Sequence, residues 1–339
     1  MNIRDIARIA NVTPGTVSKV LNNYPDISEA TREHVKKIIE EYQYTPAFRN
    51  KATISMAKTM TIGLVIEGVY NSLYSDMHQM ISNRLHNAGY TILSYSDNYF
   101  SQDKTEKFEE ILKYTTDHNL TGFIYLGGSF AKVQKSYFDK LPCPTIFVDT
   151  VLPVSYAETN YSSIQTNNYD CAKHQMQSLI DKGHKDIVLM ISSKDDTSIY
   201  GLRYEGYKDV LEKAGLSHNL ENVVEGQYIY PKTYEDLKKH LENHKEITAI
   251  CVSADIMAPA VLRAIYDTGK IPGKDIDVIS YDGLDLASYL HPSVTSFVQP
   301  KIDIVDGVYN LLTGLIDKEK THQHITFQST FVVRESFIP

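Results

Sequence analysis

The chain has 339 residues and a formal net charge of −8, with 42% hydrophobic and 22% charged residues. This composition is typical of a soluble globular protein, and the length suffices for two or three domains with a sizeable core. No run of about 18 apolar residues occurs, and charged residues interrupt the start, which argues against a membrane span and a secretory segment. Three widely spaced cysteines, Cys143, Cys171 and Cys251, indicate reduced thiols in a cytoplasmic protein.

The charge is uneven along the chain. Residues 1–60 contain nine Lys and Arg against six Asp and Glu, which gives this part +3 and leaves −11 for the remainder. A slightly basic start on an acidic body fits contact with phosphates at one end of the chain only.

The first 22 residues have the pattern of two short helices joined by a tight turn. Apolar residues recur at helical spacing in the first: Ile3, Ile6, Ala7 and Ala10. Thr13 is a good N-cap residue and Pro14 suits the first helical position, so a second helix is predicted from there to about Asn22. Its outer face is small and polar: Gly15, Thr16, Ser18, Lys19 and Asn22. Such a pair is typical of a helix-turn-helix, whose second helix enters the DNA major groove, although any short helical hairpin shows the same periodicity.

A third helix is predicted after a loop at residues 24–26. Ser28 can cap it, and apolar residues recur at helical spacing up to Tyr42, so the helix would close a three-helix core near Gln43. Thr45-Pro46 ends it. Residues 47–60 contain few large apolar side chains, and their simplest interpretation is a linker.

From Thr61 onward the pattern changes to alternating strands and helices. Strands are predicted at 62–66, 90–95, 122–126, 145–148, 187–191, 223–225, 247–252 and 276–280. Helices are predicted at 77–88, 103–118, 130–140, 168–182, 199–214, 234–244 and 256–268. This alternation indicates βαβ units and parallel sheets flanked by helices, and the two series indicate two similar lobes.

The opening residues resemble the DNA-binding headpiece of the lactose-repressor/galactose-repressor (LacI/GalR) family of bacterial transcription regulators. The match runs Ile3-x-Asp5-Ile6-Ala7-x-x-Ala10-x-Val12-Thr13-x-x-Thr16-Val17-Ser18-x-Val20-Leu21-Asn22 and continues through residues 27–32 and 38–46. The resemblance implies a DNA-binding domain at 1–46 that contacts DNA through the second predicted helix, from Thr13 to Asn22, with Pro14, Gly15 and Lys19 placed to read bases. It also implies a hinge helix at 47–60 that wedges a leucine into the minor groove. Here Thr53 stands about where that leucine is expected, and Ile54 is the candidate wedge.

The remainder resembles the effector-binding core of the same family, which shares its fold with periplasmic sugar-binding proteins. The matching segments are Gly183-His184-Lys185-x-Ile187, Arg203-x-x-Gly206-Tyr207, Ala254-Asp255-x-Met257-Ala258, Ile279-Ser280-Tyr281-Asp282 and Val333-Arg334-Glu335-Ser336. The resemblance implies lobe crossings near 160, 291 and 323. The first lobe would comprise 61–160 and 292–323, including a helix at 302–316. The second would comprise 161–291 and 324–339, including a strand at 326–333.

In this family the ligand lies in the cleft between the lobes, beyond the carboxyl ends of the strands. The positions that the resemblance assigns to ligand contact are Tyr74, Asp149, Arg203, Tyr228, Asp255 and Asp282. Arg203 would donate to ligand oxygens, Asp282 would accept from hydroxyls, and Tyr228 would stack on the ligand. Without the resemblance, an early helical arginine is more often salt-bridged and a tyrosine more often packing.

Two departures from the family pattern bear on the ligand. Ala254 stands where the family often has Asn before Asp255, so one ligand hydrogen bond is missing or comes from elsewhere. Glu67 follows the first strand of the core, where the family usually has an uncharged residue. If Glu67 faces the cleft, it would favour a ligand with an amine or several hydroxyls and disfavour an anion.

The sequence shows no nucleophile–base set, phosphate-binding loop or convincing metal motif, so no enzyme, cofactor or metal is expected. His240 and His244 have helical spacing but no third ligand. The resemblance implies a cytoplasmic repressor that binds operator DNA as a homodimer or tetramer, without a membrane partner, under control of a small molecule, a sugar or sugar derivative. Inducer and corepressor remain alternatives. The rivals are a sugar-binding receptor of a transport system and a metabolic enzyme on the same scaffold.

Overall fold

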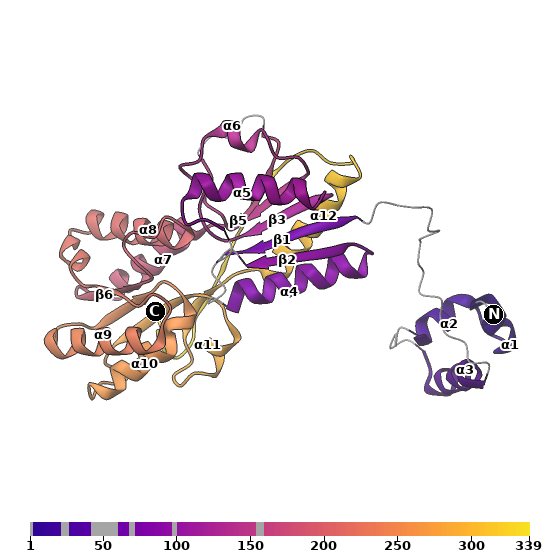
Figure 1. The fold of residues 1–339 in the computed structure, drawn as a ribbon. Coiled ribbons are helices and arrows are strands. Elements are labelled where there is room, and N and C mark those ends of the chain that lie inside the picture. The colour runs from indigo at the N-terminus through magenta and orange to yellow at the C-terminus, as the bar shows by residue number, and fades with distance from the viewer. Residues whose placement is uncertain (1–2, 22–26, 42–59, 68–71, 97–99, 154–158) are drawn as a thin grey trace. The chain divides into compact units, whose positions relative to one another are not determined.

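The computed structural model describes residues 3–21, 27–41, 60–67, 72–96, 100–153 and 159–339. The chain divides into two compact units, Met1–Lys58 and Thr59–Pro339 (Figure 1). The described part of the smaller unit is helical, and the larger unit contains two six-stranded sheets. No helix in these residue ranges combines the length and the apolar character that crossing a bilayer requires.

The smaller unit consists of α1 (Ile3–Ile9), α2 (Pro14–Leu21) and α3 (Glu29–Glu41). Apolar residues of these helices and of the turn after α1 form its core: Ile6, Ala7, Ala10, Val17, Val20, Val35 and Ile38. The burial of these residues follows the helical spacing of the sequence, so all three predicted helices are confirmed. The predicted end of the third helix, residues 42–46, lies outside the described residues.

Two hydroxyl side chains fix where α2 and α3 begin. The backbone N–H of Thr16 donates to Thr13 Oγ1 at 3.1 Å, and that of Thr31 donates to Ser28 Oγ at 3.3 Å. Each bond satisfies a backbone donor that the first turn of a helix leaves unpaired. Asn11 has a φ of 52° in the turn between α1 and α2, a conformation that asparagine tolerates better than most residues. The predicted helix-turn-helix therefore forms with the expected caps.

The first sheet of the larger unit has the strand order β11-β5-β4-β3-β1-β2. Its strands are β1 (Thr61–Ile66), β2 (Thr91–Ser96), β3 (Gly122–Leu126), β4 (Thr145–Val148), β5 (Ser162–Thr166) and β11 (His324–Phe327). All neighbouring pairs are parallel. Successive residues of β1 point to opposite faces, so Leu64 shares a core with α4 (Ser72–Asn87) and α12 (Lys301–Ile316), whereas Val65 shares one with α5 (Lys104–Asp117) (Figure 1). This sheet and its helices, with the short α6 (Lys135–Phe138), are the first lobe.

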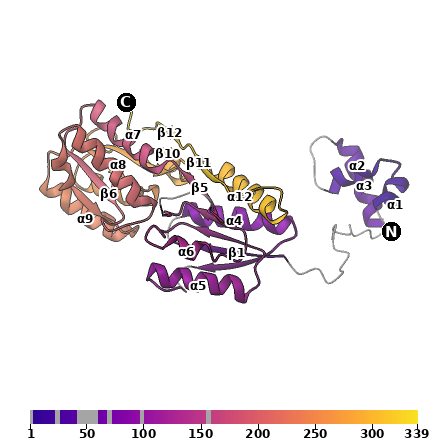
Figure 2. The same cartoon turned by 90° about the horizontal axis from the view of Figure 1, so that it is seen from above.

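The second sheet has the order β12-β10-β9-β8-β6-β7 and is parallel except for the β10–β12 pair. Its strands are β6 (Ile187–Ile191), β7 (Val223–Glu225), β8 (Ala249–Val252), β9 (Asp277–Asp282), β10 (Thr295–Val298) and β12 (Thr330–Val332). Helices cover both faces: α7 and α8 share one core, on the side where Figure 2 shows them next to each other, and α9 and α10 pack on the other face. These helices are α7 (Asn168–Asp181), α8 (Ile199–Lys213), α9 (Tyr230–Asn243), α10 (Ala258–Asp267) and α11 (Asp285–Tyr289), with short 3-10 turns η2 (Ser217–Leu220) and η3 (Asp255–Met257). Together they are the second lobe, and the predicted two-lobed α/β core is confirmed.

The chain passes between the lobes later than the sequence predicted. β5 and β11 pair in the first sheet and β10 in the second, so the crossings follow Thr166, Val298 and Phe327 rather than lying near 160, 291 and 323. The predicted strand at 326–333 is wrong, because residues 324–327 join the first sheet and 330–332 the second. β5 reads Ser-Ser-Ile-Gln-Thr, which lacks the apolar run that marked the other buried strands.

The predicted helix at 130–140 is also wrong in extent, since α6 has only four residues. The start of that stretch is held by β-type bonds instead. The backbone N–H of Phe130 donates to the carbonyl of Val151 at 2.7 Å, beside a parallel bridge between Ser129 and Val151. A helix cannot begin before these bonds end.

Candidate functional site

Four of the predicted ligand residues lie together, although they come from both lobes. Asp149 directly follows β4 and Asp282 ends β9, while Tyr74 lies in α4 and Arg203 in α8. All four side chains are buried. Burial raises the pKa of Tyr74 well above its usual value, with smaller effects from the nearby Tyr200, Asp149, Arg203 and Asp282. The carboxyl ends of strands from both sheets therefore meet at one polar cluster, where doubly wound sheets bind ligands.

Arg203 is the central cation of this cluster and is fully buried. Its Nε donates to Asn168 Oδ1 at 2.9 Å, its Nη2 to Asp282 Oδ1 at 3.0 Å, and its Nη1 to the carbonyl of Ser253. The guanidinium also lies over the ring of Tyr281, 3.6 Å from its centroid. Burial opposes the positive charge, but Asp282 outweighs it and the pKa of Arg203 is raised. Arg203 is thus paired within the protein before any ligand arrives.

Asp149 differs from the other acids of the cluster because half of its carboxylate is unused. Oδ1 accepts from the backbone N–H of Thr166 at 3.1 Å, whereas Oδ2 is buried without a hydrogen-bond partner among the described residues. Burial raises the pKa of Asp149 to about 6. Its φ of 46° is unfavourable for an aspartate. A buried acceptor held in a strained conformation is a feature of ligand sites.

Asp255 is committed to its own lobe. Its Oδ2 accepts from the backbone N–H of Leu284 at 2.8 Å, and its Oδ1 from Ser296 Oγ at 2.9 Å. Burial raises its pKa to about 7, with a smaller contribution from Asp282. Asp255 therefore fixes the turn after β9 and positions Asp282.

Tyr228 contributes a buried hydroxyl to the second-lobe side. Its ring lies 5.1 Å from that of Tyr200, and its hydroxyl, like that of Tyr74, has no hydrogen-bond partner in the described part of the chain. Burial raises the pKa of Tyr228 well above its usual value. Gln227 and Tyr228 both have positive φ, 52° and 58°, so this tight turn aims the ring.

Glu67 pairs within the first lobe. Its carboxylate accepts from Lys104 Nζ at 2.9 Å and from the hydroxyl of Tyr125 at 2.8 Å, with Lys107 Nζ at 3.9 Å. A Cβ atom at Gly128 would lie 1.7 Å from Glu67 Oε2, so the carboxylate occupies the space that this glycine leaves. Since two lysines already compensate its charge, the preference for an amine expected from Glu67 loses its physical basis.

Sequence reasoning missed several residues that support the cluster. Asn168, Gln299 and Thr166 bond to Arg203, Asp282 and Asp149 from the crossings between lobes. Thr166 ends β5, and Asn168 and Gln299 lie just beyond β5 and β10, where the sequence has no periodic signal.

Asp196, in the loop before α8, is half-buried and accepts from the backbone N–H of Ser198 at 2.8 Å. Ser198 in turn caps α8, which carries Arg203. The loop before α8 therefore helps to place the central cation.

The predicted DNA-facing residues that the structure describes lie on α2 or, for Thr13, at the cap that precedes it. Thr13, Pro14, Gly15 and Lys19 are exposed, and Thr16 is half-buried with its hydroxyl 2.9 Å from that of Thr13. The side chain of Ser18, and Asn22 and Ile54 as a whole, lie outside the described residues. α2 thus presents a narrow polar face of small side chains and one lysine, a shape compatible with close approach to a DNA groove.

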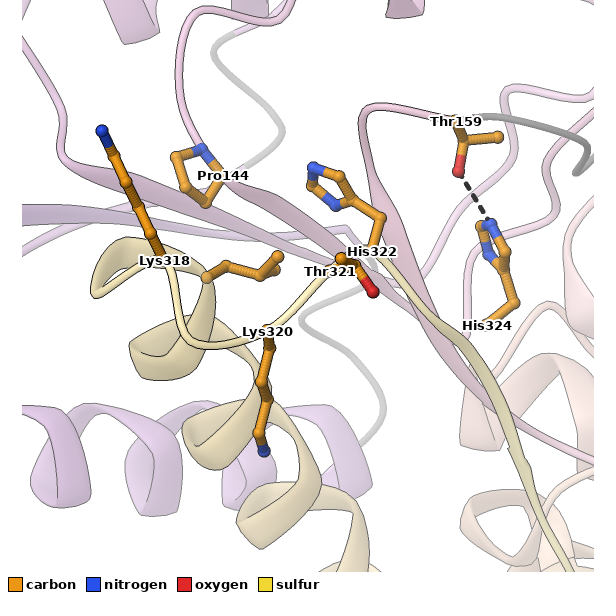
Figure 3. Close-up of a pocket in the computed structure, with 8 residues that line it drawn as sticks. Pro144, Thr159, Lys318, Lys320, Thr321, His322 and His324 are labelled. Atoms are coloured by element: carbon orange, nitrogen blue, oxygen red, sulfur yellow. Dashed lines mark hydrogen bonds between the residues drawn. The ribbon is translucent and has the colours of Figure 1, made fainter.

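A surface hollow of about 500 Å³ lies at the opposite strand ends of the first lobe, away from Asp149 (Figure 3). His324 bonds to Thr159 Oγ1 and Ser163 Oγ, both at 2.9 Å, and burial lowers its pKa. Figure 3 shows the amino groups of Lys318 and Lys320 pointing away from one another. The hollow therefore lacks convergent charge.

Comparison with known proteins agrees with this geometry. Residues 2–47 match the family model "Bacterial regulatory proteins, lacI family", and residues 176–337 match a periplasmic binding protein-like domain. The HTH-type transcriptional regulator MalR of Clostridium butyricum is 32% identical over 338 residues, which cover 99% of both chains. Among solved structures, the lac repressor dimer bound to operator and the anti-inducer ONPF matches with a TM-score of 0.69 and 20% identity over 100% of this chain and 99% of that one. A complex of the transcriptional regulator CelR with cellobiose matches with a TM-score of 0.67 and 23% identity over 99% of each chain.

Proposed function

This chain belongs to the LacI family of bacterial regulatory proteins, and we propose that it represses transcription from an operator that it leaves when an uncharged, hydroxyl-rich molecule binds between its lobes. The observation that carries the proposal is the buried cluster of Tyr74, Asp149, Arg203 and Asp282, joined in one chain with a helix-turn-helix. A helix-turn-helix is not expected in a transport receptor or a metabolic enzyme. The relative MalR is a transcriptional regulator.

The DNA-binding role falls to α2. Its exposed residues Pro14, Gly15 and Lys19 stand at the positions that read bases in helix-turn-helix proteins. Glycine and proline offer no side-chain donor, so Lys19 supplies the direct hydrogen bond, for example to a guanine, and DNA shape supplies the remainder. Two copies in a homodimer place two such helices in successive half-sites of a near-palindromic operator.

The chemistry of the cluster favours a neutral ligand with several hydroxyls. Asp149 Oδ2, the hydroxyl of Tyr74 and Ser253 Oγ are buried without partners among the described residues, so they are available to accept from or donate to ligand hydroxyls. Arg203 already donates to three protein acceptors. A phosphate or carboxylate would find this guanidinium engaged and would meet the negative charge of the neighbouring acids. The bound cellobiose of CelR is a ligand of the favoured class.

The proposed mechanism is allosteric. A ligand that bonds to residues of both lobes, such as Asp149 and Arg203, favours one relative position of the lobes over others. Movement of the first lobes in a dimer then alters the segment between the units and uncouples the two DNA-binding helices. A coupling free energy of about 1–3 kcal/mol would change operator affinity about 5–150-fold.

Titration of DNA tests the first half of the proposal. Labelled duplexes from the promoters of the neighbouring genes are titrated with the full chain, with a scrambled duplex as control. We expect selective binding at physiological salt that weakens as salt rises. Absence of site-selective binding, both without sugar and with ribose, glucose, maltose or cellobiose, would overturn the proposal.

Ligand screening tests the second half. The full chain is screened by thermal shift with ribose, glucose, maltose, cellobiose and glucose 6-phosphate, and each is then added to the operator complex. We expect a neutral sugar to raise the melting temperature and release the operator. Preferential stabilisation by glucose 6-phosphate would contradict the neutral ligand, and tighter operator binding with a sugar would reverse the sign of control.

A further inference from the structure

The lobe crossings contain a closed ring of hydrogen bonds that includes two residues of the effector cluster. Thr166 Oγ1 donates to Gln299 Oε1 at 3.5 Å, and Gln299 Nε2 donates to Asp282 Oδ1 at 3.1 Å. Asp282 Oδ1 also accepts from Arg203 Nη2 at 3.0 Å, and Arg203 Nε donates to Asn168 Oδ1 at 2.9 Å. Asn168 Nδ2 closes the ring by donating to Thr166 Oγ1 at 3.0 Å. The ring is Thr166, Gln299, Asp282, Arg203 and Asn168.

Three members of the ring lie where the chain crosses between the lobes. Thr166 ends β5 of the first sheet and Asn168 begins α7 of the second lobe, so these two residues bracket the first crossing. Gln299 lies between β10 of the second sheet and α12 of the first lobe, so it occupies the second crossing. The first and second crossings are therefore tied to each other through side chains that also hold Arg203 and Asp282.

The ring reaches the first-lobe side of the cluster as well. The backbone N–H of Thr166 donates to Asp149 Oδ1 at 3.1 Å, which links the ring to the acid whose second oxygen is unpartnered in the described chain. Asp149 is thus held by Thr166 and Asp282 by Gln299, and these two ring members are bonded to each other although the acids belong to different lobes.

The third crossing is tied differently and serves as a comparison. Asn167 Nδ2 donates to Gln328 Oε1 at 2.6 Å, and Asn167 Oδ1 accepts from the backbone N–H of Ser329 at 3.0 Å. Gln328 is exposed and bonds to Asn167, which is not a member of the ring, whereas Gln299 is 3% exposed. The chain therefore offers two glutamines at lobe crossings, one inside the ring and one outside it.

Burial makes the ring an all-or-none arrangement. Every member of the ring is less than 5% exposed, so a donor or acceptor that loses its partner cannot turn to water. A change in the position of Arg203 or Asp282 must therefore be followed by Gln299, Thr166 and Asn168 or leave a buried polar group unpaired. Motion of the crossings and contact with a ligand then belong to one cooperative unit.

We propose that this ring is the element that connects ligand contact to lobe position, with Gln299, Thr166 and Asn168 as positioning residues for the effector. The proposal rests on the function proposed above, because it assigns those three residues to the same ligand site. They act through Asp149, Arg203 and Asp282 and not by touching the ligand.

Paired substitutions test the ring. Thr166→Val removes the hydroxyl at nearly constant shape, and Thr166→Ser keeps it. Gln299→Met breaks the second link, and Gln328→Met makes the same change at the crossing outside the ring. In the full chain, we expect Thr166→Val and Gln299→Met to weaken sugar affinity by tenfold or more and to reduce the sugar-induced change in operator affinity. Operator affinity without sugar should stay within twofold of the parent chain, and the two controls should match the parent in all three measurements.

The sugar used is the member of the panel of ribose, glucose, maltose and cellobiose with the largest thermal shift on the parent chain. A ligand-free readout accompanies it, namely amide hydrogen exchange in peptides that contain residues 166–170 and 299–303. We expect faster exchange in Thr166→Val and Gln299→Met than in Thr166→Ser and Gln328→Met.

The outcomes separate the two proposals. If the parent chain releases its operator with sugar and the ring variants release it equally, the role of the ring is overturned and the proposed function stands. If the parent responds to no sugar, the effector part of the proposed function fails. The exchange experiment then still decides whether the ring ties the crossings, and equal exchange in ring and control variants would overturn it.

Discussion

The DNA-facing helix and the effector cluster differ in how the chain gathers their residues. Pro14 to Lys19 follow one another on a single helix, which Thr13 caps. The effector cluster takes Tyr74, Asp149 and Arg203 from separate elements of two lobes, and only the sheet topology brings them together. A contiguous site can be identified from sequence spacing, whereas an assembled one requires the fold.

The two regions also differ in what their polar residues do for stability. The polar face of α2 is exposed, and the smaller unit is held by the apolar core behind it. The acids and the arginine of the effector cluster are buried, and Arg203 is paired with Asp282. We therefore expect removal of an exposed polar side chain on α2 to change DNA binding and not folding, and substitutions in the cluster to change both ligand binding and folding.

The largest effect is expected at the centre of the buried cluster. Arg203→Leu leaves Asp282 buried without its cation and removes the donor to Asn168. Breaking one side of a buried ion pair costs about 3–5 kcal/mol, so the free energy of unfolding should fall by that amount in urea at pH 7. Arg263→Leu, at an exposed pair with Asp267, is the matched control and should barely move the transition. Equal urea midpoints for both variants would contradict the view that buried polar residues of the cluster support folding and exposed ones do not.

The pH dependence of stability tests the same cluster through Asp149. Burial raises its pKa from 3.8 to about 6, so the folded chain binds this proton more tightly than the unfolded chain does. The contribution of Asp149 to the free energy of unfolding is therefore complete below pH 4 and is lost as the pH rises through 6. The loss is about 3 kcal/mol for two pKa units. Asp149→Asn removes this titration. Unfolding free energies measured from pH 4 to 7 should fall less steeply in the variant, and parallel curves would contradict the assignment.

A smaller effect, confined to DNA binding, is expected at the exposed helix. Lys19→Ala should lower operator affinity by about 1–3 kcal/mol and relax the sequence preference. The free energy of unfolding should not change, because the side chain is exposed. Fluorescence anisotropy with the operator and a scrambled duplex measures both affinities, and Lys245→Ala in the larger unit is the control. Equal weakening on both duplexes would make Lys19 a phosphate contact.

These differences explain how much the sequence could predict. The caps at Thr13 and Ser28, and the buried strands with apolar runs, follow from local rules. β5 was missed because its residues are largely polar, and this shifted the first crossing. The resemblance placed Arg203 and Asp282, but it carried no information on Gln299, whose partners are set by the meeting of two crossings. Interactions that depend on which strands are neighbours leave no periodic trace in the sequence.

The smallest effect concerns a residue of α2 that folding does not require. Gly15 has no positive φ, and a Cβ added there would meet only Thr13 Oγ1, at an ordinary contact distance of 3.6 Å. Gly15→Ala should therefore raise the free energy of unfolding by about 0.5–1 kcal/mol, since alanine is the better helix former. If operator affinity falls in this more stable variant, Gly15 allows α2 to approach DNA closely. Helix stability then favours alanine at this position, and DNA binding favours glycine. Thermal unfolding and anisotropy of Gly15→Ala beside Lys19→Ala separate the two quantities. Unchanged operator affinity would remove Gly15 from the DNA-reading face, which would then rest on Lys19 and its polar neighbours alone.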